Sequence, residues 1–395
     1  MDAHDARVVA RAPRLHCVTN SLGHPVVAQP AVTVLMSVHN GERYLAAAID
    51  SVLTQTFENF EFVIVDDAST DATRSILDAY TDPRIRRLAN DSNIGLTKSL
   101  NRGLALARAP LVARQDADDV SLPRRLALQV VFMAAHPEIV LVGSRVRVID
   151  ESGRRRVGHI DVRAESAVGV RWQLLFSNPF AHSAVMFRLN AVRDALGGYD
   201  ERFEFNQDFE LWSRVIGHFE AANLPDVLVE YRAHADSIAG RRGAAFLASR
   251  RANLERNVTV QRANVYALTA SESLADSWPP LWTSTHVTWI TGEPHSPERA
   301  MELMEQLWTQ FRARFPTAEG HQDVRRVSAS ACVHLAHFLL PRAPACALGA
   351  LVRAIRWDST VAFRSLPFVI SALLKGRTQA TMLRAWRWMV PWRED

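Results

Sequence analysis

Residues 32–71 read VTVLMSVHNGERYLAAAIDSVLTQTFENFEFVIVDDASTD, and this stretch shows two kinds of hydrophobic pattern in turn. The runs 32–38 and 60–65 are short, rich in β-branched residues and followed by polar residues, which is typical of buried strands. Between them, apolar residues recur at helical spacing within residues 42–55. The stretch therefore predicts a strand–helix–strand unit, which is the building block of a parallel sheet.

The same alternation continues along the N-terminal half of the chain. The cluster Ser69-Thr70-Asp71 suits a helix N-terminus, and helical spacing follows it as far as Tyr80. The other predicted elements are strands at 85–88, 110–114, 139–149 and 228–231, and helices at 94–107, after Pro123 and from Asn206. This order favours an α/β fold with a mostly parallel sheet, helices on both faces and a ligand site at the carboxyl ends of the strands.

Polar and acidic residues follow three of these predicted strands. They are His39-Asn40, Asp66-Asp67 and the run Asp116-Ala117-Asp118-Asp119. Gathering so many carboxylates at one edge is costly unless something positive binds there. An Asp-x-Asp pair suits Mg²⁺ or Mn²⁺, which take few protein ligands and complete their shell with water and substrate phosphates. Taken alone, the run fits an acidic turn equally well.

The chain has no glycine-rich phosphate cradle. Neither GxxxxGK[ST] nor GxGxxG after the first strand is present, which argues against P-loop and dinucleotide-binding proteins. We therefore expect phosphate charge to be met by a metal ion and by arginines such as Arg114, Arg232 or Arg241.

Two further residues leave their role open on sequence alone. Asp208 lies near the start of a predicted helix, where it fits either a capping acid or a general base. His234 follows the predicted strand 228–231 and fits a metal ligand, a phosphate contact or a surface loop residue.

Length and charge together indicate two modules. The chain of 395 residues is too long for one compact core. Residues 1–240 carry 26 Lys and Arg against 30 Asp and Glu, whereas residues 241–395 carry 20 against 12 and hold eight of the ten tryptophans. The second part has a helical pattern, and it lacks any nucleic-acid-binding motif, so no nucleic-acid partner is expected.

The ends of the chain and its cysteines bear on its compartment. Residues 1–30 lack a secretory signal pattern and predict a loose extension, and no run of 18 apolar residues predicts a membrane span. The three cysteines are widely spaced, which favours a reducing compartment. We expect a cytoplasmic protein, or one attached to the inner membrane surface.

Residues 380–390 carry the pattern that would make such an attachment. Met382, Leu383 and Trp386 fall on one side of a helix, and Arg384 lies apart from them. This is typical of an interfacial amphipathic helix, although an ordinary helix packed on the protein fits the pattern too.

Residues 32–71, the segment NIGLTKSLNRGLALARAPLVARQDADD (93–119) and the segment GGYDERFEFNQDFELWSR (197–214) together resemble family 2 glycosyltransferases, which have the GT-A fold. The resemblance implies a GT-A catalytic domain (31–240), which lies between the loose extension (1–30) and the helical, basic, Trp-rich module (241–395) inferred from the pattern and charge. It implies Asp208 as the catalytic base. It implies nucleotide-sugar contacts from Ser37, His39, Asn40, Asp66, Asp67, Asn93, Gly95, Lys98, Arg114, Asp116 and Ala117. It implies metal ligands Asp118 and Asp116, with His234 as a further candidate, and acceptor or diphosphate contacts from His182, Trp212 and Arg232.

The resemblance also implies an activity. It predicts an inverting transferase that depends on Mn²⁺ or Mg²⁺ and moves a sugar from a nucleoside-diphosphate donor, with UDP the expected nucleotide. The acceptor would be a saccharide or a lipid-linked sugar in cell-surface polysaccharide synthesis. His39 and Gln207 depart from the family pattern, which commonly has an aromatic residue and a Glu there. These departures leave open a non-catalytic nucleotide-sugar-binding or assembly protein, while a sugar nucleotidylyltransferase lacks support because its glycine-rich signature is absent.

Overall fold

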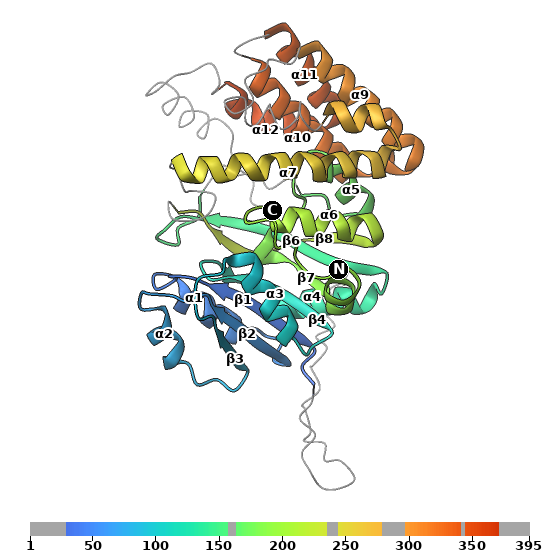
Figure 1. The fold of residues 1–395 in the computed structure, drawn as a ribbon. Coiled ribbons are helices and arrows are strands. Elements are labelled where there is room, and N and C mark those ends of the chain that lie inside the picture. The colour runs from blue at the N-terminus through green and yellow to red at the C-terminus, as the bar shows by residue number, and fades with distance from the viewer. Residues whose placement is uncertain (1–28, 157–162, 235–243, 279–296, 341–343, 371–395) are drawn as a thin grey trace, which may run out of the picture.

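The computed structural model describes residues 29–156, 163–234, 244–278, 297–340 and 344–370 (Figure 1). Within these residues, eight strands form one sheet in the order β3-β2-β1-β4-β7-β6-β8-β5. The strands are β1 (Val32–Val38), β2 (Phe60–Asp66), β3 (Ile85–Ala89), β4 (Leu111–Asp116), β5 (Val120–Ser121), β6 (Ile139–Ile149), β7 (Met186–Arg188) and β8 (Glu220–Arg232). The predicted mixed α/β architecture is confirmed.

The strand directions confirm most of the predicted parallel sheet and correct one part of it. β1 pairs in parallel with β2 and β4, β2 with β3, and β6 with β8. The short antiparallel strand β7, which the sequence pattern did not predict, lies between β4 and β6 in the sheet. A strand of three residues is too short to give a periodic signal. Because β7 is antiparallel to both neighbours, β4 and β6 still run in the same direction.

Helices cover both faces of the sheet and continue beyond it. They are α1 (Leu45–Leu53), α2 (Thr73–Ala79), α3 (Leu96–Leu106), α4 (Arg125–Ala135), α5 (Ala167–Leu174), α6 (Gln207–His218), α7 (Ala244–Thr269), α9 (Pro297–Arg314), α10 (Gln322–Leu339), α11 (Pro344–Trp357) and α12 (Ser359–Ile370). Val34 and Met36 of β1 pack in one core with α1, α2 and α4, whereas Leu35 packs in another with α3. This alternation follows from the two-residue period of a strand.

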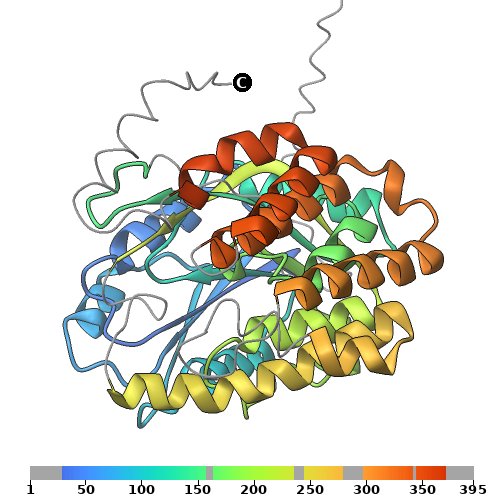
Figure 2. The ribbon, with the colours of Figure 1, turned by 90° about the horizontal axis from the view of Figure 1, so that it is seen from above.

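The C-terminal helices share the core on the α3 side of the sheet. Trp172 of α5 donates a hydrogen bond from Nε1 to Ser328 Oγ of α10 at 2.9 Å, and its ring centroid lies 4.8 Å from that of Phe311 in α9. Trp278 Nε1 donates to the carbonyl oxygen of Leu175 at 2.9 Å. Seen from above, α7 runs along one side and α9 to α12 lie over the sheet-bearing part (Figure 2). The predicted helical C-terminal region is confirmed, and its helices extend the core of the sheet domain.

Asp323, in the first turn of α10, makes a polar link between the C-terminal helices and the start of α5. Its Oδ2 accepts hydrogen bonds from Glu165 N at 3.0 Å, Ser166 N at 2.7 Å and Ser166 Oγ at 2.7 Å. A Cβ at Gly169 would collide with this carboxylate, so only glycine lets α5 approach so closely. The start of α5 is thereby fixed against α10.

Three sequence predictions fall on residues that the structure does not describe. They concern most of the extension 1–30, Arg241 and the amphipathic segment 380–390. Among the helices within the described ranges, none is long and apolar enough to span a bilayer.

We predict that Asp323→Ala destabilises the fold by about 2–3 kcal/mol, because buried N–H groups at the start of α5 lose their acceptor. Urea unfolding followed by circular dichroism measures this loss. The exposed Asp226 provides a matched control, since Asp226→Ala removes the same atoms from the surface. An equal and small effect of both substitutions would show that Asp323 does not fix α5.

Candidate active site

The carboxyl ends of three neighbouring strands bring the predicted donor residues together. In the sheet register, Ser37 of β1 pairs with Asp116 of β4, and Val38 pairs with Asp66 of β2. Asp66 is buried, and its Oδ1 accepts a hydrogen bond from Ser69 N at 3.0 Å. Residues far apart in the sequence therefore lie side by side at one edge, as the alternating pattern predicted.

Asp67 joins the end of β2 to the start of α3. Its carboxylate accepts hydrogen bonds from Asn90 Nδ2 at 2.7 Å, Ile94 N at 2.9 Å and Gly95 N at 2.8 Å. Gly95 has φ of 90°, a conformation that favours glycine, and α3 begins at the next residue. Asp67 thus positions the segment that carries Asn93 and Lys98, both exposed.

His39 and Asn40 form an exposed turn after β1. His39 Nδ1 lies 2.8 Å from the carbonyl oxygen of Asp67, a contact that places the ring proton on Nδ1. Asn40 has φ of 53°, and its Oδ1 accepts a hydrogen bond from Thr70 N at 2.8 Å. The turn is therefore held against the end of β2, with both side chains reaching solvent.

Asp116 and Arg114 form an ion pair at the end of β4. Arg114 Nη2 lies 2.6 Å from Asp116 Oδ1, with the arginine side chain fully buried and 28% of the aspartate side chain exposed. Burial acts to raise the pKa of Asp116, but nearby positive charge, chiefly that of Arg114, outweighs it, so the pKa is lowered. Arg114 therefore lies beneath the edge and keeps Asp116 ionised, while Ala117 beside it is partly exposed.

Arg125, at the start of α4, supplies a second buried positive charge that sequence analysis missed. It donates hydrogen bonds to Gln115 Oε1 at 2.9 Å, Ser121 Oγ at 2.8 Å and the carbonyl oxygen of Arg114 at 2.6 Å. Burial, with a further contribution from Arg114, lowers the pKa of Arg125 to about 9. Arg124 is exposed and Arg125 is buried, and nothing in the sequence of this pair distinguishes them.

Asp118 and Asp119 occupy different surroundings although they are adjacent. Asp118 Oδ2 lies 2.9 Å from His234 Nε2, and 32% of its side chain is exposed. Asp119 is buried and accepts hydrogen bonds from Ser183 Oγ and, at 2.7 Å, from Arg232 N. Burial, followed by the charges of neighbouring aspartates, raises the pKa of both carboxyls. Asp118 thus reaches solvent while contacting the largely buried ring of His234, whereas Asp119 holds the turn in place.

Arg232 fastens the acidic turn to the end of β8. Its Nε donates to the carbonyl oxygen of Asp118 at 2.9 Å, and its guanidinium lies 4.6 Å from the ring centroid of Tyr44. The side chain is buried. Sequence analysis expected Arg232 at the acceptor or diphosphate, and the structure places it behind the turn that carries Asp118.

Asp208 lies in the first turn of α6 and belongs to the same electrostatic cluster. Asn178 Nδ2 donates to Asp208 Oδ2 at 2.7 Å, a contact that no sequence pattern indicated. Burial raises the pKa of Asp208, and the charge of Asp116 raises it further, against the lowering effect of hydrogen bonds. Burial raises the pKa of Tyr231, and the negative charges of Asp119, Asp116, Asp118 and Asp208 raise it further.

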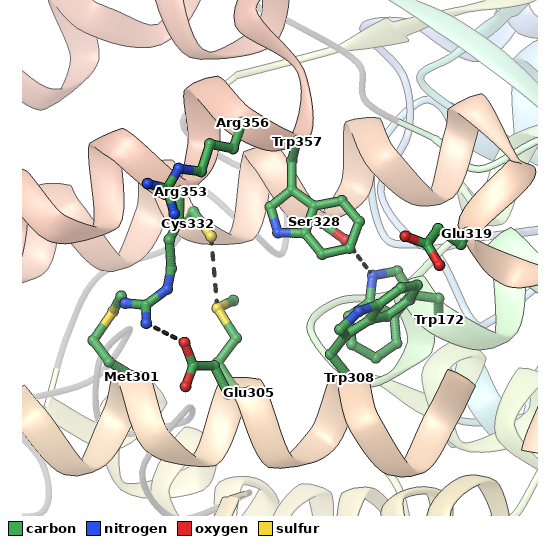
Figure 3. A pocket seen from close by; sticks show the side chains of 11 residues that line it. Trp172, Met301, Glu305, Trp308, Glu319, Ser328, Cys332, Arg353, Arg356 and Trp357 are labelled. Carbon is green, nitrogen blue, oxygen red and sulfur yellow. Dashed lines mark hydrogen bonds and ion pairs between the residues drawn. The ribbon is translucent and has the colours of Figure 1, made fainter. Parts of the chain in front are cut away.

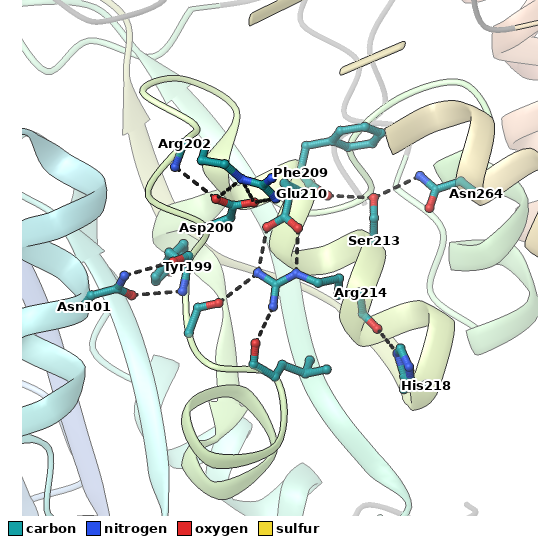
Figure 4. Close-up of polar contacts among 12 residues, drawn as sticks. Asn101, Tyr199, Asp200, Arg202, Phe209, Glu210, Ser213, Arg214, His218 and Asn264 are labelled. Atoms are coloured by element: carbon teal, nitrogen blue, oxygen red, sulfur yellow. Dashed lines mark hydrogen bonds and ion pairs between the residues drawn. The ribbon is translucent and has the colours of Figure 1, made fainter. Parts of the chain in front are cut away.

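Polar contacts on several sides hold the helix that carries Asp208 (Figure 4). Arg214 pairs with Glu210 and donates to the carbonyl oxygens of Leu196 at 2.7 Å and Gly198 at 2.8 Å. On the other side, Asn264 Nδ2 of α7 donates to Ser213 Oγ at 2.9 Å. α6 is therefore fixed to the loop before it and to the C-terminal helices.

Trp212 lies deeper than the acceptor role predicted for it suggests, whereas His182 is partly exposed. His182 Nε2 lies 2.9 Å from Tyr199 Oη, and burial, with the Arg114 charge, lowers the pKa of His182 to about 3. Its imidazole is therefore neutral at physiological pH. Trp212 is fully buried, with its ring centroid 6.2 Å from that of His182. Trp212 thus supports His182 from the core.

The donor set at this edge fits a hard divalent cation. Asp118 and His234 are in contact and offer an oxygen and a nitrogen, and Asp116 lies next in the turn. No group of three or more His, Cys, Asp or Glu ligands is found in the part of the chain that the structure describes. A cation bound here would complete its coordination with donor phosphates and water, as Mg²⁺ commonly does.

Comparison with known proteins agrees with this geometry. The family model Glycosyl transferase family 2 matches residues 33–192. The putative glycosyltransferase EpsE of Bacillus subtilis is 36% identical over 218 residues, covering 54% of this chain and 76% of EpsE. The amylovoran biosynthesis glycosyltransferase AmsE of Erwinia amylovora is 34% identical over 224 residues, covering 55% and 82%.

The chain belongs to glycosyltransferase family 2. The predicted family and enzyme class are confirmed. Among solved structures, residues 1–349 of S. aureus TarS in complex with UDP match this glycosyltransferase with a TM-score of 0.50 and 16% identity, covering 84% of this chain and 90% of that one. At this identity the likeness concerns the fold alone, and it confirms the predicted GT-A type.

We predict that Asp208→Asn makes the enzyme more stable at about pH 8, with the difference disappearing as the pH falls toward about 4. The folded-state pKa of Asp208 is raised, so the stability from this group is present at low pH and lost as the pH rises through that pKa. Thermal unfolding at both pH values measures the effect, with exposed Asp91→Asn as control. Lower stability of Asp208→Asn than of the unsubstituted enzyme at about pH 8 would show that the surroundings of Asp208 do not raise its pKa.

Proposed function

We propose that this glycosyltransferase moves a sugar from a nucleoside-diphosphate donor, with UDP as the nucleotide, to a hydroxyl of a saccharide or lipid-linked acceptor. The observation that carries the proposal is that residues 182–183 contact both the acidic turn and the helix of Asp208. Ser183 Oγ donates to Asp119 Oδ2, and the His182 ring centroid lies 6.2 Å from that of Trp212 in α6. This arrangement supports a single site in which the half-buried carboxylate of Asp208 lies near the acidic turn. We assign this chemistry to residues 31–240 and a supporting role to residues 241–395.

Asp208 would act as the general base. Asn178 fixes one of its carboxylate oxygens, and its raised pKa brings its basicity closer to the operating pH. The acceptor hydroxyl loses its proton to Asp208 as its oxygen attacks the anomeric carbon, and the bond from that carbon to the diphosphate breaks on the opposite face. The configuration is therefore inverted.

The remaining residues of the edge would bind and orient the donor. Ser37, Asp66 and the His39-Asn40 turn lie where the nucleotide is expected, and Asp67 holds the loop of Asn93 and Gly95 beside them. A divalent cation, Mn²⁺ or Mg²⁺, held by Asp118 and Asp116 with His234, would neutralise charge on the leaving diphosphate. Arg114 and Arg125 fix the ionised Asp116 from below.

The named relatives support a place in polysaccharide synthesis. AmsE is an amylovoran biosynthesis enzyme, and WbnJ of Escherichia coli, 30% identical over 211 residues, is an O-antigen biosynthesis glycosyltransferase. WfgD of Escherichia coli, 26% identical over 217 residues, uses UDP-Glc and a diphosphoundecaprenol-linked acceptor. A lipid-linked acceptor would bring the enzyme to the inner membrane surface, where the segment 380–390 is the candidate contact. The non-catalytic alternative is not favoured, because Asp116, Asp118 and Asp208 are all present.

We predict that Asp208→Asn lowers the transfer rate about 10²- to 10⁴-fold while leaving donor affinity nearly unchanged, because the amide keeps the shape but cannot take a proton. Initial rates with UDP-sugars and isothermal titration with UDP measure the two quantities separately. Asp91→Asn controls for the loss of a surface charge. Unchanged turnover in Asp208→Asn would remove the proposed base.

We predict that Asp118→Ala weakens UDP binding in the presence of Mn²⁺ or Mg²⁺ and has little effect when EDTA is present. The carboxylate contributes through the cation, so its loss matters only when a cation bridges it to the phosphates. A titration of both proteins with UDP, with and without metal, measures the difference. Equal weakening in EDTA would show that Asp118 acts without a metal.

A further inference from the structure

The C-terminal helices contain a cavity that plays no part in the proposed transfer (Figure 3). Its volume is about 340 Å³, at the lower end of the roughly 300–1,000 Å³ range of small-molecule sites. None of its lining residues belongs to the donor edge, which is the edge of the sheet formed by the carboxyl ends of β1, β2 and β4. Trp172 comes from α5, and the other walls come from α9, α10, α11 and the turn that contains Glu319.

Tryptophan side chains form one wall of this cavity. Trp308 of α9 lies between the other two, with ring centroids 5.3 Å from Trp172 and 4.8 Å from Trp357. The interplanar angles are 70° and 88°, so the three indoles meet edge to face. Trp172 is almost fully buried, whereas Trp308 and Trp357 are partly exposed. The outer indoles therefore offer apolar surface that the described residues leave partly uncovered.

Charged side chains face the same space and balance one another. Glu305 of α9 forms an ion pair with Arg353 of α11, and Glu319 forms one with Arg312 at 3.6 Å. Arg356 lies at the lining beside Trp357. The two acids and two arginines of the lining carry no net charge between them. The ion pair of Glu305 and Arg353 supplies both an acceptor and a fork of donors.

We infer that this cavity binds a neutral saccharide unit. A pyranose ring has apolar C–H faces that pack on indoles and hydroxyl groups that a carboxylate and a guanidinium can hydrogen-bond together. An aliphatic chain would cover part of the Glu305–Arg353 ion pair and replace its water contacts with no hydrogen bond, at a free-energy cost. A phosphate or another anion would meet two carboxylates in the lining as well as the arginines.

The position of the cavity gives the bound saccharide a function. The cavity lies among helices that are fixed to the sheet domain through Trp172 and Asp323, so it keeps a constant position relative to the donor edge. A sugar of a growing acceptor chain held there would keep that chain near the enzyme between transfers, which raises its effective concentration. This role rests on the proposed function, whereas saccharide binding itself needs neither donor nor turnover.

Saturation-transfer NMR on the full chain tests the inference, with methyl glycosides of glucose, galactose, mannose and N-acetylglucosamine as separate probes. We expect at least one glycoside to bind, and Trp308→Ala and Glu305→Gln each to raise its Kd about tenfold. Asp208→Asn should bind that glycoside as the unsubstituted protein does, which separates the cavity from the catalytic site. Trp308→Phe should retain most of the affinity, because it keeps an aromatic face.

Three results would overturn the inference. None of the four glycosides binds, or the glycoside binds equally well to Trp308→Ala and Glu305→Gln, or n-octanol or inorganic phosphate displaces it. Circular dichroism shows whether Trp308→Ala is folded. If it is not, the Kd of the glycoside in Glu305→Gln and in Trp357→Phe shows whether the cavity binds it. Loss of glycoside binding in Asp208→Asn alone would place the sugar at the catalytic edge and contradict the cavity.

Discussion

The ion pair between the buried Arg114 and the partly exposed Asp116 is the interaction on which the edge formed by the carboxyl ends of β1, β2 and β4 depends. Several aspartates meet at this edge, and their mutual repulsion alone would favour protonation of them all. Arg114, with Arg125 behind it, offsets this repulsion at Asp116 and lowers its pKa, whereas burial raises the pKa of Asp208. The cost of burying two guanidinium groups is reduced by hydrogen bonds to Gln115 and to backbone carbonyls. In the proposed reaction, the ionised Asp116 would serve the donor and Asp208, with its raised pKa, would serve the acceptor.

The sequence predicted those parts of the site that follow strand ends. Asp66 and Asp116 were placed correctly because parallel strands bring their carboxyl ends to a common edge. The sequence did not indicate Arg125 or Asn178, since the depth of an arginine and the partner of an aspartate depend on packing between distant elements. Strand β7 was missed for the related reason that three residues carry no period. The predicted roles of the site residues in catalysis remain proposals.

The charge split of the sequence does not correspond to two separate cores. The basic, tryptophan-rich part was expected to form its own module, yet Trp278 and Phe311 pack in the same core as Leu35 of the sheet. The polar anchor at Asp323 adds a second constraint between the parts. The helices therefore help to fix α6, which carries Asp208 and contacts α7 through Ser213 and Asn264.

The central claim is that Asp208 is the base of the transfer reaction, and the pH profile of kcat at saturating donor and metal tests it most directly. The account predicts that kcat falls with decreasing pH through one protonation, with an apparent pKa above the 3.8 of an unperturbed aspartate. The residual rate of Asp208→Asn should lack this limb. A profile that is flat in this range, or that keeps the same limb in Asp208→Asn, would contradict the account.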